Sequence, residues 1–231
     1  MLRWVALVFA FALPAGAGEI ITGARYDDPT TRYAHGVLGD AVEWGTLVLE
    51  TNDGRVLRIV LPEERVFEDL EPRLADLDGN GRPEAIVVES HQSFGARLSI
   101  YGLEGLVAAN DWIGTPNRWL APIGAADLDG DGVTDIAYVD RPHLAKTIRI
   151  FAFEDSGLVE RAALRGYSNH RIGEDFISGG IRDCGQGPEM VVARADWSGI
   201  VGLRWTGSGF AETAVAGDVS QSVFEQALDC R

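Results

Sequence analysis

Two nine-residue stretches decide the fold of this chain: Asp76-Leu77-Asp78-Gly79-Asn80-Gly81-Arg82-Pro83-Glu84 and Asp127-Leu128-Asp129-Gly130-Asp131-Gly132-Val133-Thr134-Asp135. Both place acidic or amide side chains and glycines at the same positions. The match continues downstream, because an apolar run follows each stretch, Ala85–Val88 in one and Ile136–Val139 in the other. Self-similarity at a fixed distance is the sequence signature of a repeat architecture. The chain is therefore interpreted as a series of repeated units.

Two further copies of the unit are degenerate. Gly180–Val192 keeps the turn residues, but Ile181 replaces the first aspartate and Gly185 the third ligand. We expect this copy to keep the turn and to have lost the metal. Upstream, Gly36–Leu61 repeats the strand pattern without an acidic loop. The interpretation is one domain over residues 18–231, with repeats at about 33–70, 71–119, 120–173 and 174–231.

Short runs of β-branched and aromatic residues fill these units, bounded by Gly, Pro, Asn and Asp, and such runs predict strands. The clearest are Ala85–Glu89, Arg97–Tyr101, Ile136–Val139, Thr147–Phe153, Met190–Ala193 and Val201–Trp205. Units of about 50 residues with about four short strands each are typical of a β-propeller or a related array. The predicted fold class is all-β, a propeller of about four units.

The acidic loops offer oxygen atoms at alternate positions, and their glycines let the chain curl around a hard cation. Calcium takes roughly six to eight oxygen ligands, so each loop predicts a calcium site. The predicted ligands are Asp76, Asp78, Asn80, the carbonyl of Arg82 and Glu84 in one loop, and Asp127, Asp129, Asp131, the carbonyl of Val133 and Asp135 in the other. An EF-hand would need a carboxylate where Val87 and Tyr138 stand. A pair of Asp-Gly turns without metal is the alternative.

These loops resemble the FG-GAP (VCBS-type) repeats of integrin alpha-subunit propellers and of many exported bacterial proteins. The resemblance covers Leu74 to Trp205, with the departures at Ile181 and Gly185 already noted. It implies a β-propeller in which calcium lies in the loop that joins the first and second strands of a blade. Such loops stabilise the repeat and perform no chemistry.

The same placement would gather a second set of turns on the face opposite the metals. Exposed aromatic and arginine side chains on such turns are typical of a binding surface. The candidate ligand-binding residues are His91, Trp112, Arg118, Trp119, Asp140, His143, Asn169, His170, Arg171, Asp196 and Trp197. The alternative is that Trp112 and Trp119 pack between blades and that the histidines cap turns.

The two ends of the chain indicate export. Residues 1–17 have the layout of a cleaved secretory signal peptide: Arg3, the apolar run Trp4–Leu13, and the small residues Ala15 and Ala17. The run is shorter than the roughly 18 apolar residues of a bilayer span, so the mature protein is expected to be secreted or periplasmic, without a membrane span. In an oxidising compartment Cys184 and Cys230 are expected to form a disulfide, with free buried thiols as the alternative.

Composition narrows the function classes. The net charge of −15 argues against nucleic acid and anionic membranes as partners. A binding or assembly module for a protein or carbohydrate ligand is favoured over an enzyme, and self-association stays open. The alternative is a metal-dependent hydrolase in which His91, His143 and His170 converge with Asp140 or Asp196. The sequence has no nucleophile elbow and no His-Glu-x-x-His pair that would support catalysis.

Overall fold

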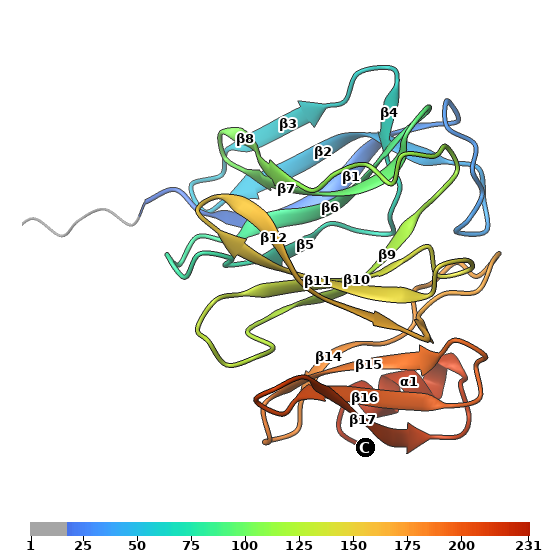
Figure 1. Cartoon of the computed structure of the whole chain (residues 1–231). Helices are drawn as coiled ribbons and strands as arrows, with labels where there is room; N and C mark the ends of the chain where they lie inside the picture. The colour runs from blue at the N-terminus through green and yellow to red at the C-terminus, as the bar shows by residue number, and fades with distance from the viewer. Residues whose placement is uncertain (1–17) are drawn as a thin grey trace, which may run out of the picture.

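The computed structural model describes residues 18–231, so the predicted signal peptide, residues 1–17, lies outside the described part. Four successive units of antiparallel strands make up residues 18–231 (Figure 1). The first two units consist of β1 (Ile21–Thr30), β2 (Glu43–Thr51), β3 (Val56–Val60) and β4 (Arg65–Phe67), followed by β5 (Arg73–Ala75), β6 (Glu84–His91), β7 (Gly95–Gly102) and β8 (Gly105–Ala109). The last two consist of β9 (Leu120–Ala126), β10 (Asp135–Asp140), β11 (Thr147–Glu154) and β12 (Gly157–Arg165), then β13 (Tyr167–Ser168), β14 (Gly180–Asp183), β15 (Pro188–Arg194), β16 (Ile200–Trp205), β17 (Phe210–Ala216) and α1 (Gln221–Leu228).

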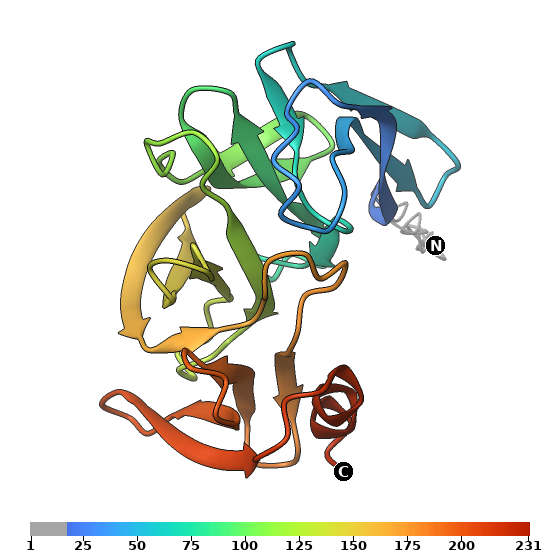
Figure 2. The same ribbon diagram turned by 90° about the vertical axis from the view of Figure 1, so that its right-hand side faces the viewer.

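This architecture confirms the predicted all-β class, and each of the six predicted strands lies inside an observed one. Units two to four each contain a four-stranded antiparallel meander, β5–β8, β9–β12 and β14–β17. Strand β4 joins the first two units into one eight-stranded sheet, because it pairs with both β2 and β6. The sheets follow one another in a propeller-like arc (Figure 2). Each hydrogen-bonded sheet of residues 18–231 has two free ends, so these strands close into no barrel.

The second strand of the meander in units two to four is buried on both faces, because a neighbouring unit or helix α1 packs against either side of it. In β6, Ala85 and Val87 contact the first unit, whereas Ile86 and Val88 contact the third. Successive side chains of a strand point to opposite faces, so this division follows from the uninterrupted apolar run. Strands β10 and β15 divide their side chains in the same way. The core is therefore a series of layers between sheets.

Each end of the arc carries its own cover. Helix α1 packs on the last sheet, where Phe224 and Ala227 contact Val191 and Ile200. On the outer face of the first unit, Arg58 binds Asp27 at 2.7 Å and Asp28 at 2.8 Å. Arg25 forms further ion pairs there with Asp27 and Glu50. Stacked repeats need terminal units whose outer face tolerates water, and a helix and an ion-pair layer serve this purpose here. Among residues 18–231, no helix has the length and hydropathy that a transmembrane span requires.

The helical cover gives a direct test of this packing. Replacement Phe224→Ala should lower the free energy of unfolding by about 3–5 kcal/mol, because Phe224 is only 2% exposed. Urea denaturation measures the change. The matched control is Glu225→Ala on the exposed side of α1, which should stay within about 0.5 kcal/mol of the wild type. Equal effects of the two replacements would show that α1 does not cover the last sheet.

Candidate functional site

The first acidic loop joins β5 to β6, the first two strands of the meander. Asp76, Asp78 and Glu84 each bring one carboxylate oxygen within 4.8 Å of the others. Gly79 and Gly81 have φ angles of 71° and 80°, which a residue with a Cβ adopts only with strain, and so they allow the tight curl. Asp76 accepts the Gly81 N–H at 2.8 Å and the Asn80 N–H at 3.0 Å. The backbone therefore holds the acidic side chains together.

The second acidic loop, between β9 and β10, repeats this arrangement. Asp127, Asp129 and Asp135 converge within the same 4.8 Å. Asp135 accepts the Leu128 N–H at 3.1 Å, as Glu84 accepts the Leu77 N–H at 3.1 Å in the first loop. The last carboxylate of each loop is thus the first residue of the buried strand that follows. Two independent segments have the same donor geometry at the same place in their unit.

Like charges meet in both loops. Burial, followed by the charges of Asp78 and Asp76, raises the pKa of Glu84. Burial and the three other aspartates of its loop raise the pKa of Asp135 to about 6. Carboxylates held this close repel one another, and an opposite charge between them would relieve the repulsion. The all-oxygen donor set fits a hard cation.

The remaining predicted ligands have other contacts. Asn80 accepts the Arg82 N–H at 2.7 Å and donates to Asp78 at 2.8 Å. Asp131 accepts the Val133 N–H at 2.8 Å and lies outside the converging group. These contacts belong to the loop itself, so the roles of the two side chains and of the Arg82 and Val133 carbonyls stay predictions.

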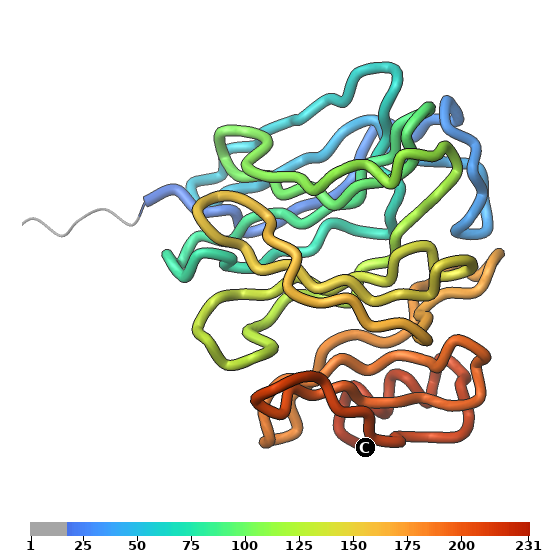
Figure 3. Tube along the Cα trace, in the orientation of Figure 1, coloured from blue at the N-terminus to red at the C-terminus, as the bar shows by residue number. Residues whose placement is uncertain are grey.

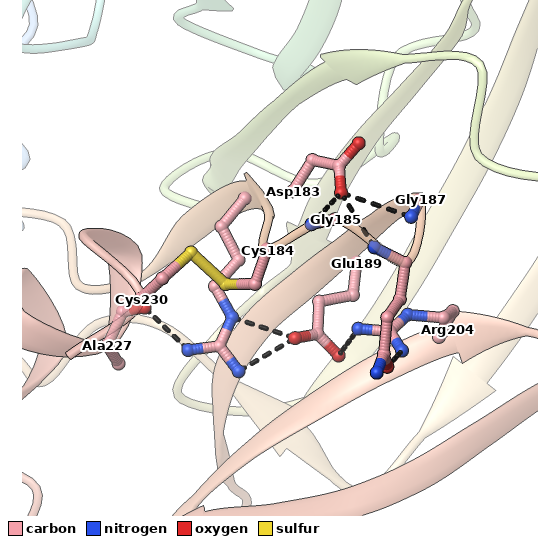
Figure 4. Close-up of a disulfide and its surroundings, with 10 residues drawn as sticks. Asp183, Cys184, Gly185, Gly187, Glu189, Arg204, Ala227 and Cys230 are labelled. Carbon is pink, nitrogen blue, oxygen red and sulfur yellow. Dashed lines mark hydrogen bonds and ion pairs between the residues drawn. A yellow bond between two sulfur atoms is a disulfide. The ribbon is translucent and has the colours of Figure 1, made fainter.

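In the third loop, between β14 and β15, arginine side chains pair with the last carboxylate. Asp183 accepts the N–H groups of Gly185, Gln186 and Gly187, so the turn is kept (Figure 4). Glu189 occupies the place of Glu84 and Asp135, and it binds Arg182 at 2.7 Å and Arg204 at 3.0 Å. Two guanidinium groups thus neutralise the one buried carboxylate of this loop, and the loss of the metal there stays a prediction.

A disulfide fixes this third loop to the C-terminus. Cys184 and Cys230 are bonded, with their Cα atoms 5.7 Å apart, which confirms the predicted pairing. Arg182 also donates to the carbonyl of Ala227 at the end of α1, at 2.5 Å. Figure 4 shows the disulfide close to Glu189. The loop is therefore linked to the helix by a covalent bond and a charge-assisted hydrogen bond.

The predicted ligand-binding residues lie around the turns at the other end of the strands, which we call the rim. In Figure 3 the acidic loops lie at the left edge of the trace, and the turns β6–β7, β10–β11 and β15–β16 lie at the right edge. A cavity of 270 Å³ includes Trp112 and Asp140 in its wall. A second cavity of 210 Å³ includes Arg118, Trp119 and His143. The structure thus divides five of the predicted residues between two hollows.

The other predicted residues, together with Trp119 of the smaller cavity, are engaged in packing or in turns. Asn169 is buried and donates to the carbonyls of Ala121 and Pro122. Trp119 is only 2% exposed and donates its indole N–H to the Glu68 carbonyl at 2.8 Å, as the packing alternative expects. In the turns, the Arg171 guanidinium lies over the Trp197 ring, 4.0 Å from its centroid. Asp196 accepts the Ser198 N–H.

The three histidines proposed for a hydrolase do not meet. His143 and His170 bond through Nε2 and Nδ1 at 2.9 Å, but His91 contacts Phe94 and Trp112 instead. The Nε2 of His170 faces the Glu174 carbonyl at 2.9 Å and must donate to it, so Nδ1 accepts from His143. Within residues 18–231, the only groups of three metal-ligating side chains that converge are the two acidic loops.

Several rim residues were missed from sequence. His35 lines the smaller cavity, and its Nδ1 forms a hydrogen bond of 2.6 Å with the carboxyl group of buried Glu68. Arg149 and Glu160 line the larger one and form an ion pair at 2.8 Å. They belong to a loop and to strand faces outside the turns, so turn position gave no signal for them. For Arg149 and Glu160 the available signal was their position along β11 and β12, since alternate residues of a strand share one face.

The histidine pair predicts a pH dependence. Burial and the neighbouring His170 lower the pKa of His143 to about 4, and burial lowers the pKa of His170. The unfolded chain holds histidine near about 6.5, so it binds more protons than the folded chain between these values. The free energy of unfolding should therefore fall as the pH drops from about 6.5 towards 4.

Urea denaturation at a series of pH values measures this dependence. Replacement His143→Asn removes one of the two groups, so the wild type should lose stability relative to this variant as the pH falls. The Asp183→Asn variant serves as a control for general acid effects, since Asp183 ends β14, in a different sheet from the β10–β11 turn that carries His143. A difference between wild type and His143→Asn that is constant with pH would contradict the account.

Comparison with protein families adds one finding. Residues 76–138 match the model of the FG-GAP-like repeat. The match begins at the first acidic loop and ends in β10, so it spans both loops and the strands between them. Searches of curated proteins and of solved structures gave no match. The chain therefore contains an FG-GAP-like repeat over residues 76–138, as an FG-GAP/VCBS repeat protein does.

Proposed function

We propose that this protein is an exported, calcium-stabilised module that binds a protein or carbohydrate ligand through its rim. The carrying observation is that three carboxylates converge in each of two loops that lie within the FG-GAP-like match. A repeat of this kind in an array of antiparallel sheets suggests a propeller-type binding module. The calcium, the export and the ligand are the parts that go beyond this similarity.

Calcium suits the loops better than other common ions. All the converging groups are carboxylates, and hard oxygen donors favour calcium or magnesium over zinc or copper. The flexible, glycine-containing curl favours calcium, because magnesium needs a nearly ideal octahedron and gives up its water reluctantly. Asp76, Asp78 and Glu84 would hold one ion, and Asp127, Asp129 and Asp135 the other. The ion would supply positive charge between carboxylates that otherwise repel.

The rim supports binding over catalysis. It carries two cavities whose walls include Trp112, Arg118 and Asp140, and aromatic and arginine side chains dominate the energetics of recognition. His143 forms a hydrogen bond with His170, and the lowered pKa of His143 keeps its imidazole uncharged at neutral pH. A hydrogen-bonded imidazole pair without a third ligand or an adjacent nucleophile supports no particular reaction.

Export is supported by two features. The predicted signal peptide at residues 1–17 would direct the chain out of the cytosol. The disulfide of Cys184 and Cys230 is of a kind that persists in oxidising compartments. Millimolar calcium is common outside cells, where modules with weak calcium sites operate. A secreted or periplasmic location would therefore suit a protein that depends on calcium for stability.

A thermal melt in calcium and in a chelator tests the stabilisation. Calcium at a hundredfold excess over its dissociation constant should add about 2.7 kcal/mol per site to the free energy of unfolding. For a chain of this size, each kcal/mol raises Tm by roughly 2–4 °C, so the shift should be readily measured. Asp129→Asn should reduce the shift, since it weakens one of two sites.

Asp183→Asn is the matched control, because Asp183 holds the equivalent place in the loop occupied by arginines. It should leave the calcium shift unchanged. A parallel zinc titration separates the alternative metalloenzyme, for which zinc would stabilise the protein through the histidines. No calcium shift, or the same loss from both replacements, would overturn the calcium assignment.

A further inference from the structure

The larger rim cavity lies where the second and third units meet. Its 270 Å³ are enclosed by the segment Asn110–Ile113, which follows β8, and by side chains from one face of β10, β11 and β12. Deeper on that face Ile136 and Phe151 pack in the core between the sheets. At the rim the same face carries polar and charged side chains instead of continuing the apolar packing of the core. The change points to a surface shaped for a ligand.

The floor of the cavity is a chain of fixed ion pairs. Asp140 is 3% exposed and binds Arg141 at 2.7 Å and Arg149 at 3.0 Å. Arg149 also binds Glu160 at 2.8 Å. Each group uses part of its hydrogen-bonding capacity, since a carboxylate has about four lone-pair positions and a guanidinium five N–H donors. The floor therefore offers donors and acceptors whose orientation is already set.

Two buried side chains extend this polar surface. Tyr138 is 4% exposed, and its hydroxyl accepts the side-chain N–H of Asn110 at 2.9 Å. None of the hydrogen bonds formed among residues 18–231 uses the hydroxyl proton of Tyr138. The side chain of Asn110 is itself fixed, because its Oδ1 accepts the Leu98 N–H at 2.8 Å. A ligand atom in the cavity could accept that proton.

Trp112 adds an apolar wall. Arg97 lies over its ring at 4.2 Å from the centroid, and the rings of His91 and Trp112 form a T-shaped pair with centroids 5.5 Å apart. Arg97 is in turn bound to Glu89, which is fully buried. The indole is only partly buried, and it lines the cavity. The ring is thus held in place by neighbours while part of its surface stays available for contact.

The charge balance indicates the kind of ligand. Asp140 and Glu160 offset Arg141 and Arg149 within the ion-pair chain, and the exposed Asp111 is the one further charged group of the lining. An anionic ligand is therefore disfavoured, and a neutral ligand leaves the ion pairs of the floor intact. A wholly apolar ligand would strip water from these groups without replacing its hydrogen bonds, which is costly. A neutral ring with several hydroxyl groups and one apolar face would satisfy both the floor and Trp112.

We propose that this cavity binds a single neutral sugar residue, with the C–H face of its ring on Trp112 and its hydroxyl groups on Asp140, Arg149 and Glu160. The proposal rests on the binding role proposed above and names its ligand class. A volume of 270 Å³ is slightly below the roughly 300–1,000 Å³ of most small-molecule sites, which suits one ring better than an oligomer.

Saturation-transfer NMR with the mature protein in calcium tests the proposal. The probes are the methyl glycosides of glucose, galactose, mannose and N-acetylglucosamine, with galacturonate and glucosamine as charged comparisons. At least one neutral glycoside should give a saturable signal and exceed its charged counterpart. Trp112→Ala and Glu160→Ala should each weaken that binding at least tenfold, because they remove the stacking wall and a hydroxyl acceptor.

Leu144→Ala is the matched control, because Leu144 is exposed and lines only the smaller cavity. It should bind the glycoside as the wild type does. All three variants should keep the calcium-linked Tm shift, which separates loss of the sugar site from loss of the fold. The proposal is overturned if no neutral glycoside binds, if a charged sugar binds more tightly, or if Trp112→Ala binds normally. A missing calcium shift with sugar binding retained would overturn only the calcium assignment.

Discussion

The rest of the structure depends on the burial of β6, β10 and β15 on both faces. Each of these strands packs against a neighbouring unit or helix on either side, so an error in register would move its whole apolar set out of one layer and into the other. The acidic loops end at the first residue of β6 and of β10, Glu84 and Asp135. A cation bound in the loop would therefore fix the point at which the most buried strand of the unit begins, and so its register.

The carboxylates of the three loops occur in two different charge environments. In the first two, three carboxylates converge, and a bound cation would relieve their mutual repulsion. In the third, Ile181 replaces the first aspartate, Asp183 accepts N–H groups of its own turn, and Arg182 and Arg204 bind the remaining carboxylate, Glu189. The apolar position of Leu77 and Leu128 has become Arg182, which also reaches the end of α1. The last unit thus combines an internal cation with a disulfide, and its stability should depend less on the ionic composition of the medium.

Local sequence predicted those features that are encoded locally. The acidic loops, the β-branched runs after them and the Cys184–Cys230 pair could all be identified, because each depends on residue types at short spacing or on pairing by elimination. Helix α1 was missed, although Val223, Phe224, Ala227 and Leu228 form an apolar stripe of helical spacing. Strand β1 was missed because charges alternate along its outer face. The floor of the larger cavity depends on which strands are neighbours, and hence on contacts that no single segment specifies.

Counting bound calcium per chain tests the central claim most directly, that two of the three loops hold a metal and arginines replace it in the third. Equilibrium dialysis of the mature protein against radioactive calcium gives this number without reference to stability or to any ligand. The account predicts two ions per wild-type chain, and one tightly bound ion when Asp129 is replaced by asparagine. No bound calcium would contradict the reading of the acidic loops, and three ions would contradict the replacement of the metal by Arg182 and Arg204.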